Sequence, residues 1–228
     1  MKRLGGALGI VAPALAAPVV LLAGLLTPGY DPLTRTISRL AEPGLPASAA
    51  VGLAILIVGA AMLALAAVMG PRAVAGRVML GCAGASLMLA AAVPLNPASM
   101  QATTVHRAAT AVAMLSLTGA PLVFARALRR RDGWRGYGPL SFGLGVAMVV
   151  VLLVGLTLVP TAFAVGAWER CFLALPLAWM VLVSARLVRA SSTDPMDSSS
   201  VENNRWAAIV SKEEIARAAA ANTNSSLS

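Results

Sequence analysis

The sequence predicts an all-α fold, namely a polytopic membrane bundle of six transmembrane helices. Of the 228 residues, 58% are hydrophobic and only 12% are charged, a balance that fits no ordinary soluble domain. Six apolar runs of about 18 to 25 residues are each long enough to cross roughly 30 Å of hydrocarbon as a helix, which satisfies its own backbone polar groups in lipid. We place the spans at residues 7–27, 47–69, 78–95, 105–126, 138–160 and 171–188.

The first apolar run has two interpretations. Its opening, "MKRLGGALGIVAPALAAPVVLLAG", puts basic residues before an apolar stretch, as a signal peptide does. The alternative is an uncleaved first helix. We favour the helix because the run is longer than a typical signal core, membrane helices tolerate prolines such as Pro13 and Pro18, and removal would leave an odd number of spans.

The connections between the later spans differ in length. "GPRAVAGR" and "RRRDGWRGYGP" are short, so they predict antiparallel neighbours for spans two and three and for spans four and five. The first outer loop, residues 28–46, is longer. Its prolines bracket "LTRTISRL", which we expect to form one or two helical turns in the interface, with Thr34 or Ser38 as candidate caps.

Lysine and arginine are distributed unequally over the predicted loops. One side holds four of them, Arg35, Arg39, Arg107 and Arg170, and the other side holds eleven: Lys2, Arg3, Arg72, Arg77, Arg126, Arg129, Arg130, Arg131, Arg135, Arg186 and Arg189. The more basic side faces the cytoplasm by the positive-inside rule. The N- and C-termini are therefore both expected in the cytoplasm, and the protein in a bacterial-type cytoplasmic membrane as a multi-pass protein.

The net charge of +9 also raises nucleic acid as a partner. We expect membrane lipids instead and no nucleic acid, because the positive charge lies in short loops where insertion requires it. The two cysteines, Cys82 and Cys171, are predicted at depths that differ by about 20 Å, too far for a disulfide. No Cys/His cluster indicates a metal, and nothing indicates a cofactor.

The chain divides into two predicted parts. Residues 1–190 form the six-helix transmembrane domain, and residues 191–228 form a polar cytoplasmic tail. "SSTDPMDSSSVENN" is typical of a linker, whereas "RWAAIVSKEEIARAAAA" predicts a short terminal helix. That helix could rest on the inner leaflet or on an unknown partner protein, but we favour a weakly attached tail.

Three outer segments hold almost every residue capable of chemistry. They are the first loop and the starts of spans four and six, with Tyr30, Asp31, Arg35, Ser38, Arg39, Glu42, His106, Arg107, Glu169 and Arg170. Short connections bring these segments to one face of the bundle, so at least some of the side chains should lie within reach of one another.

His106 and the motif "WERC", residues 168–171, allow a functional and a structural interpretation. His106 could be a catalytic base, but we favour an interfacial residue hydrogen-bonded to a loop carbonyl, since no serine nucleophile motif accompanies it. Glu169 and Arg170 must each reach the interface or find a counter-charge, and we expect pairing. The candidate partners are Arg35, Arg39 or Arg107 for Glu169, and Asp31 or Glu42 for Arg170. We favour a structural clamp that holds the first loop over the bundle, ahead of a ligand-binding or catalytic cluster.

The order of these motifs resembles a known family. The first loop has the form "Y-D-P-L-x-x-x-I-S-x-L", a histidine begins span four, and an "E-R" pair precedes a tryptophan-containing last span. This pattern resembles the prokaryotic six-helix membrane family catalogued as domain of unknown function 998, over about residues 7–188. Arg39 stands where the family is expected to have an acidic residue. The resemblance implicates Tyr30, Asp31, Ser38, His106, Glu169 and Arg170, and implies no activity.

The leading hypothesis is a membrane protein that binds a lipid or small ligand at the extracytoplasmic polar cluster. The predicted ligand-binding residues are Tyr30, Asp31, Ser38, His106, Arg107, Glu169 and Arg170. An enzyme acting on lipid headgroups is the second hypothesis, with His106 as base and Glu169 or Asp31 as the orienting carboxylate. A small secondary transporter is the third, disfavoured because no ionisable residue lies at mid-membrane.

Overall fold

The computed structural model describes residues 1–70, 73–130, 133–158 and 164–193. In this part of the chain all regular structure is helical, as predicted. The helices are α1 Lys2–Leu26, α2 Ile37–Leu40, α3 Ser48–Val68, α4 Val74–Ala92, α5 Met100–Arg129, α6 Tyr137–Leu158 and α7 Val165–Thr193. The predicted terminal helix of the tail lies outside the described residues. Residues 1–188 form one compact unit, and residues 189–228 are assigned to another.

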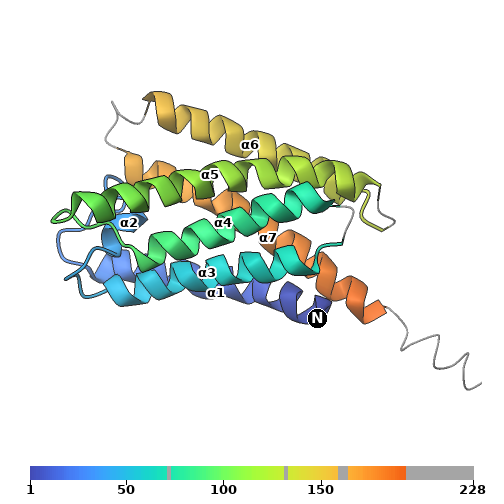
Figure 1. The fold of residues 1–228 in the computed structure, drawn as a ribbon, viewed down its shortest axis with the longest axis horizontal. Helices are drawn as coiled ribbons and strands as arrows, with labels where there is room; N and C mark the ends of the chain where they lie inside the picture. Colours follow the sequence, from blue (N-terminus) through green and yellow to red (C-terminus); the bar gives the residue numbers. More distant parts are fainter. Residues whose placement is uncertain (71–72, 131–132, 159–163, 194–228) are drawn as a thin grey trace, which may run out of the picture. The chain divides into compact units, whose positions relative to one another are not determined.

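Six of the helices are long and apolar enough to cross a membrane, which confirms the predicted number of spans. They are all the helices except α2, and α1 continues through Pro13 and Pro18. Figure 1 shows that the long helices run roughly along one direction, with α2 in the connection between α1 and α3. We call this the α2 end of the bundle, and the opposite end, where α1 begins, the N-terminal end.

Long helices that follow one another in the sequence pack side by side: α1 against α3, α3 against α4, α4 against α5 and α5 against α6. Small residues allow this close approach: an ideal Cβ on Gly59 would lie 2.7 Å from the carbonyl oxygen of Gly84. Membrane helices associate through such small-residue contacts, because lipid provides no hydrophobic force between them. Substitution at this crossing would force α3 and α4 apart.

The last helix, α7, contacts both early and late helices. Gly6 of α1 lies against Ser184 and Val188, and the rings of Phe124 in α5 and Trp179 in α7 are 5.5 Å apart. The Trp179 indole N–H also donates to the Ser141 hydroxyl of α6, at 2.9 Å. The buried core thus includes side chains from both halves of the chain.

Four of the long helices, α1, α4, α5 and α7, begin four or more residues earlier than the apolar pattern predicts, and the early starts of α5 and α7 affect the polar cluster. The fourth span was expected at residue 105, but α5 begins at Met100, where the Ser99 hydroxyl accepts from the backbone N–H of Ala102. The sixth span was expected at residue 171, but α7 begins at Val165. Glu169 and Arg170 therefore lie in the second turn of α7, where the first outer loop provides the polar partners described below.

Candidate functional site

The connection between α1 and α3 covers the α2 end of the bundle. Gly29 and Gly44 each follow a proline and have positive φ values of 70° and 90°, which glycine adopts without steric cost. Between these turns lies α2, a single helical turn as predicted for "LTRTISRL". The expected caps were wrong, because Thr36 precedes α2 without a side-chain cap bond and the Thr34 hydroxyl donates to Asp31 at 2.8 Å.

Arg170 fastens this loop to α7. Its guanidinium donates to the carbonyl oxygen of Pro32 at 2.7 Å, to that of Arg35 at 3.1 Å and to that of Gly166 within α7 at 2.9 Å. The expected partners Asp31 and Glu42 were wrong. A guanidinium group has several N–H donors, and backbone carbonyl oxygens can accept from them. The carbonyl groups of the loop therefore provide the hydrogen-bond acceptors for Arg170.

Tyr30 joins the same network. Its hydroxyl accepts from Arg170 at 2.7 Å and donates to the carbonyl oxygen of Arg35 at 2.9 Å or of Thr36 at 3.0 Å. Burial raises the pKa of the Tyr30 phenol above its ordinary value, despite the opposing effect of Arg170. The phenol therefore keeps the proton that it donates to the loop.

Glu169 is 5% exposed, and its carboxylate accepts the backbone N–H of Ile37 at the start of α2. The sequence predicted an ion pair with Arg35, Arg39 or Arg107, but the described residues place no cationic group within ion-pair distance of this carboxylate. The ion pair that they do contain joins Arg39 to Glu42, at 2.9 Å. Glu169 is therefore a buried carboxylate with one backbone hydrogen bond and no opposite charge in direct contact.

His106 occupies the second turn of α5 and is 3% exposed. Its Nδ1 lies 2.9 Å from the carbonyl oxygen of Ala90 and 3.0 Å from that of Val93, so Nδ1 carries the proton and donates it. The Nε2 atom is buried without a partner in the described part of the chain. The expected carbonyl contact of His106 is present, yet it leaves the second ring nitrogen available.

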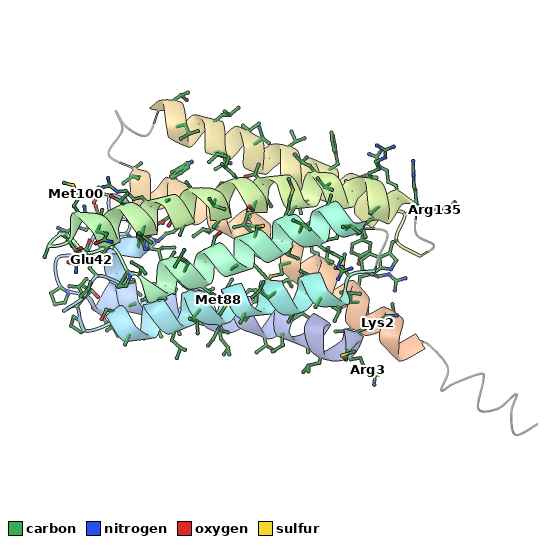
Figure 2. All side chains as sticks on the ribbon, in the orientation of Figure 1. Lys2, Arg3, Glu42, Met88, Met100 and Arg135 are labelled. Atoms are coloured by element: carbon green, nitrogen blue, oxygen red, sulfur yellow. The ribbon has the colours of Figure 1, made fainter. Side chains whose placement is uncertain are left out.

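A cavity of about 810 Å³ lies between the first loop, α5 and the start of α7. In Figure 2, the labelled Glu42 and Met100 mark this α2 end, and Lys2, Arg3 and Arg135 mark the N-terminal end. The lining comprises Thr27, Pro28, Tyr30, Thr34, Arg35, Thr36, Ser38, Arg39, Glu42, Leu45, Leu95, His106, Arg107, Thr110, Ala111, Met114, Val165, Trp168 and Glu169. It therefore combines charged groups, hydroxyls, one imidazole and several apolar side chains.

Five of the seven predicted ligand-binding residues line this cavity, namely Tyr30, Ser38, His106, Arg107 and Glu169. Arg170 is committed to the loop, and Asp31 lies outside the lining. The Asp31 carboxylate accepts from the backbone N–H of Leu33 and from the Thr34 hydroxyl, which hold its pKa below the ordinary value.

The cavity also includes residues that were not among the predicted ligand contacts. Arg35 and Arg39 come from the first loop, Thr110 lies one helical turn below His106, and Trp168 precedes Glu169. The Trp168 indole N–H donates to the carbonyl oxygen of Val151 at 2.6 Å, so the part of the cavity lining that Trp168 forms is hydrogen-bonded to α6. The spacing of four residues from His106 to Thr110 is the one signal that could have added a residue from sequence alone.

No three His, Cys, Asp or Glu side chains gather as a potential metal site within residues 1–70, 73–130, 133–158 and 164–193. Cys82 and Cys171 are both free and exposed. The chemistry available at the cavity is therefore that of guanidinium, carboxylate, imidazole and hydroxyl groups.

Six apolar spans, with buried polar groups gathered beneath one connecting loop, define an integral membrane protein of the multi-pass class. Residues 10–186 match the family described as "Protein of unknown function (DUF998)", and because the match covers most of the chain, the protein belongs to this family. The family resemblance of the loop and helix motifs is thus confirmed. No curated protein and no solved structure matches the chain.

Proposed function

We propose that the protein binds a lipid headgroup or a small polar molecule in the cavity at the α2 end. The observation that carries this proposal is His106, which lines the cavity and whose buried Nε2 atom has no hydrogen-bond partner in the described residues. A buried polar atom without a hydrogen bond is costly, so a ligand that supplies the donor would be stabilised there. The volume of about 810 Å³ suits a small ligand.

We further propose that this end faces the extracytoplasmic side of the cytoplasmic membrane. The support is the distribution of basic residues, with Lys2, Arg3 and Arg135 at the N-terminal end (Figure 2) and few arginines in the loops at the α2 end. The ligand would then come from the outer leaflet or from the space outside the membrane.

Mass spectrometry of the protein purified in mild detergent tests the binding proposal. We expect a copurifying small molecule or lipid in stoichiometric amount, and a reduced amount after His106→Ala. Thr118→Ala is the matched control, because Thr118 is also buried on α5 but does not line the cavity. Equal ligand content in all three proteins, or none in the wild type, would argue against the proposal.

A second candidate function is an enzyme that acts on lipid headgroups. The anchored Nδ1 of His106 favours it, because a fixed tautomer leaves Nε2 as a base directed away from the two carbonyls. Of the two predicted orienting carboxylates, only Glu169 lines the cavity. Headgroup turnover by the purified protein, lost in His106→Ala with normal membrane insertion, would support this candidate over simple binding.

A further inference from the structure

The cavity separates its charged groups by depth. The buried part of the lining includes Glu169 and His106, which are 5% and 3% exposed, and the Nε2 atom of His106 has no partner in the described residues. Both groups are hydrogen-bond acceptors when Glu169 is ionised and His106 is neutral. The deep part of the cavity therefore offers acceptors and negative charge.

The exposed part of the lining has the opposite character. Arg35 and Arg107 are exposed, and neither guanidinium has a hydrogen bond or ion pair within the described ranges. Arg39 also lines the cavity, but it is paired with Glu42 at 2.9 Å. Two cations without a partner among the described residues thus lie at the rim, and the buried Glu169 carboxylate has no ion-pair partner there.

A ligand with charge of only one sign would pair either with the arginines at the rim or with the buried Glu169, but not with both. An anion could bind Arg35 and Arg107, but it would leave Glu169 buried without an ion-pair partner, which is unfavourable for an ionised group. A simple cation would reach Glu169 and leave the rim unpaired. A zwitterion with its cationic end directed inward complements both parts.

We propose that the cavity binds a zwitterion in which a primary ammonium is linked to a phosphate group. The ammonium donates to Glu169 and to Nε2 of His106, and the phosphate accepts from Arg35 and Arg107. A primary ammonium provides three N–H donors for the two buried acceptors. A phosphate presents several oxygens to guanidinium groups, which bind it through paired hydrogen bonds. This inference rests on the proposed ligand-binding function and specifies the chemistry of the ligand.

Binding of free headgroup analogues to the purified full-length protein tests the inference. The probes are phosphoethanolamine, phosphocholine, glycerol phosphate and ethanolamine, measured by calorimetry. We expect phosphoethanolamine to bind on the order of tenfold or more tightly than the others. Phosphocholine keeps the phosphate and the positive charge but has no N–H donor, so it isolates the contribution of the ammonium hydrogen bonds.

Charge variants assign the two ends of the ligand. Glu169→Gln keeps an acceptor for Ile37, and it should abolish the preference for phosphoethanolamine over glycerol phosphate. Arg107→Gln should weaken both phosphate probes, and it should fold normally because Arg107 is exposed and unpaired within the described part. Asp31→Asn, outside the cavity, and Arg126→Gln, exposed at the other end of α5, are the matched controls.

Bilayer discs distinguish a lipid from a soluble ligand. Discs of phosphatidylcholine alone are compared with discs that also contain phosphatidylethanolamine, and the bound lipid is measured after extraction. Enrichment of phosphatidylethanolamine that is lost in Glu169→Gln identifies a lipid source. Binding of free phosphoethanolamine without such enrichment identifies a soluble source, and either result supports the zwitterion.

Two results would overturn the inference. Equal binding of glycerol phosphate and phosphoethanolamine would show that the anion alone is recognised. Absence of binding by every probe and lipid would also reject the zwitterion. In that case a different copurifying molecule that is lost in His106→Ala would leave the broader binding function intact, whereas no such molecule would reject both.

Discussion

Arg170 and Tyr30 illustrate how single side chains position the first loop. Arg170 donates to carbonyl groups on both the loop and α7, and Tyr30 accepts from Arg170 while it donates back to the loop. Hydrogen bonds that involve a charged partner contribute more than neutral ones, and their loss leaves a partly buried group unsatisfied. We therefore expect the loop conformation to depend on the Tyr30 hydroxyl.

Tyr30→Phe should lower the free energy of unfolding by about 1 to 3 kcal/mol, because it removes one oxygen and leaves the Arg170 donor unpaired. Thermal unfolding in detergent measures the effect. Tyr137→Phe is the control, since the Tyr137 hydroxyl has no hydrogen bond in the described structure. Identical midpoints for the two variants would contradict the assigned role of Tyr30.

At the scale of elements, the start of α7 and the first loop form one backbone-to-backbone contact. The N–H of Ala167 donates to the carbonyl oxygen of Leu33 at 3.0 Å. An ideal Cβ on Gly166 would overlap the carbonyl oxygens of Pro32 and Arg35. The loop can therefore approach α7 this closely only because residue 166 has no side chain.

Gly166→Ala should destabilise the protein by on the order of 1 to 3 kcal/mol, because backbone atoms cannot move aside as easily as a flexible side chain. Gly143→Ala is the matched control, since no atom lies within 4 Å of its ideal Cβ and alanine favours a helix over glycine by about 0.5 to 1 kcal/mol. Thermal unfolding and hydrogen exchange of residues 31–40 measure the difference. Faster exchange in Gly143→Ala but not in Gly166→Ala would refute the proposed contact.

At the scale of the whole molecule, the proposed site depends on the orientation of the bundle. The α2 end and the N-terminal end lie at opposite ends of the long helices (Figure 1). Positive charge near the N-terminal end predicts that the α2 end is exposed outside the cell. A reversed orientation would place the cavity in the cytoplasm.

Cysteine labelling of intact cells tests this orientation. In a background with Cys82→Ala and Cys171→Ala, Thr34→Cys should react with a membrane-impermeant maleimide added outside, whereas Arg135→Cys should react only after the membrane is opened. Both positions are exposed in the structure, so accessibility within the fold does not distinguish them. If Arg135→Cys alone were labelled in intact cells, the orientation of the bundle would be the reverse of the proposed one.

The membrane spans could be predicted because hydrocarbon imposes a minimum apolar length on every crossing helix. The helix starts were less predictable. Ser99 caps α5, which begins before its apolar run, and Glu169 and Arg170 fit within α7 because the distant first loop provides their hydrogen-bond partners. Local hydropathy does not contain information about such distant partners.

The sequence by itself determined the six helices, the concentration of polar residues in the first loop and at the starts of two later spans, and the family of the protein, because these follow from apolar length and the order of motifs. Only the tertiary structure decided which polar groups share the cavity. In the structure Arg170 is hydrogen-bonded to the first loop, Asp31 lies outside the cavity lining, and Glu169 and His106 are buried residues of that lining. The physical reason is that the hydrogen-bond partners of a side chain depend on the path of the folded backbone, which brings residues more than 130 positions apart into contact.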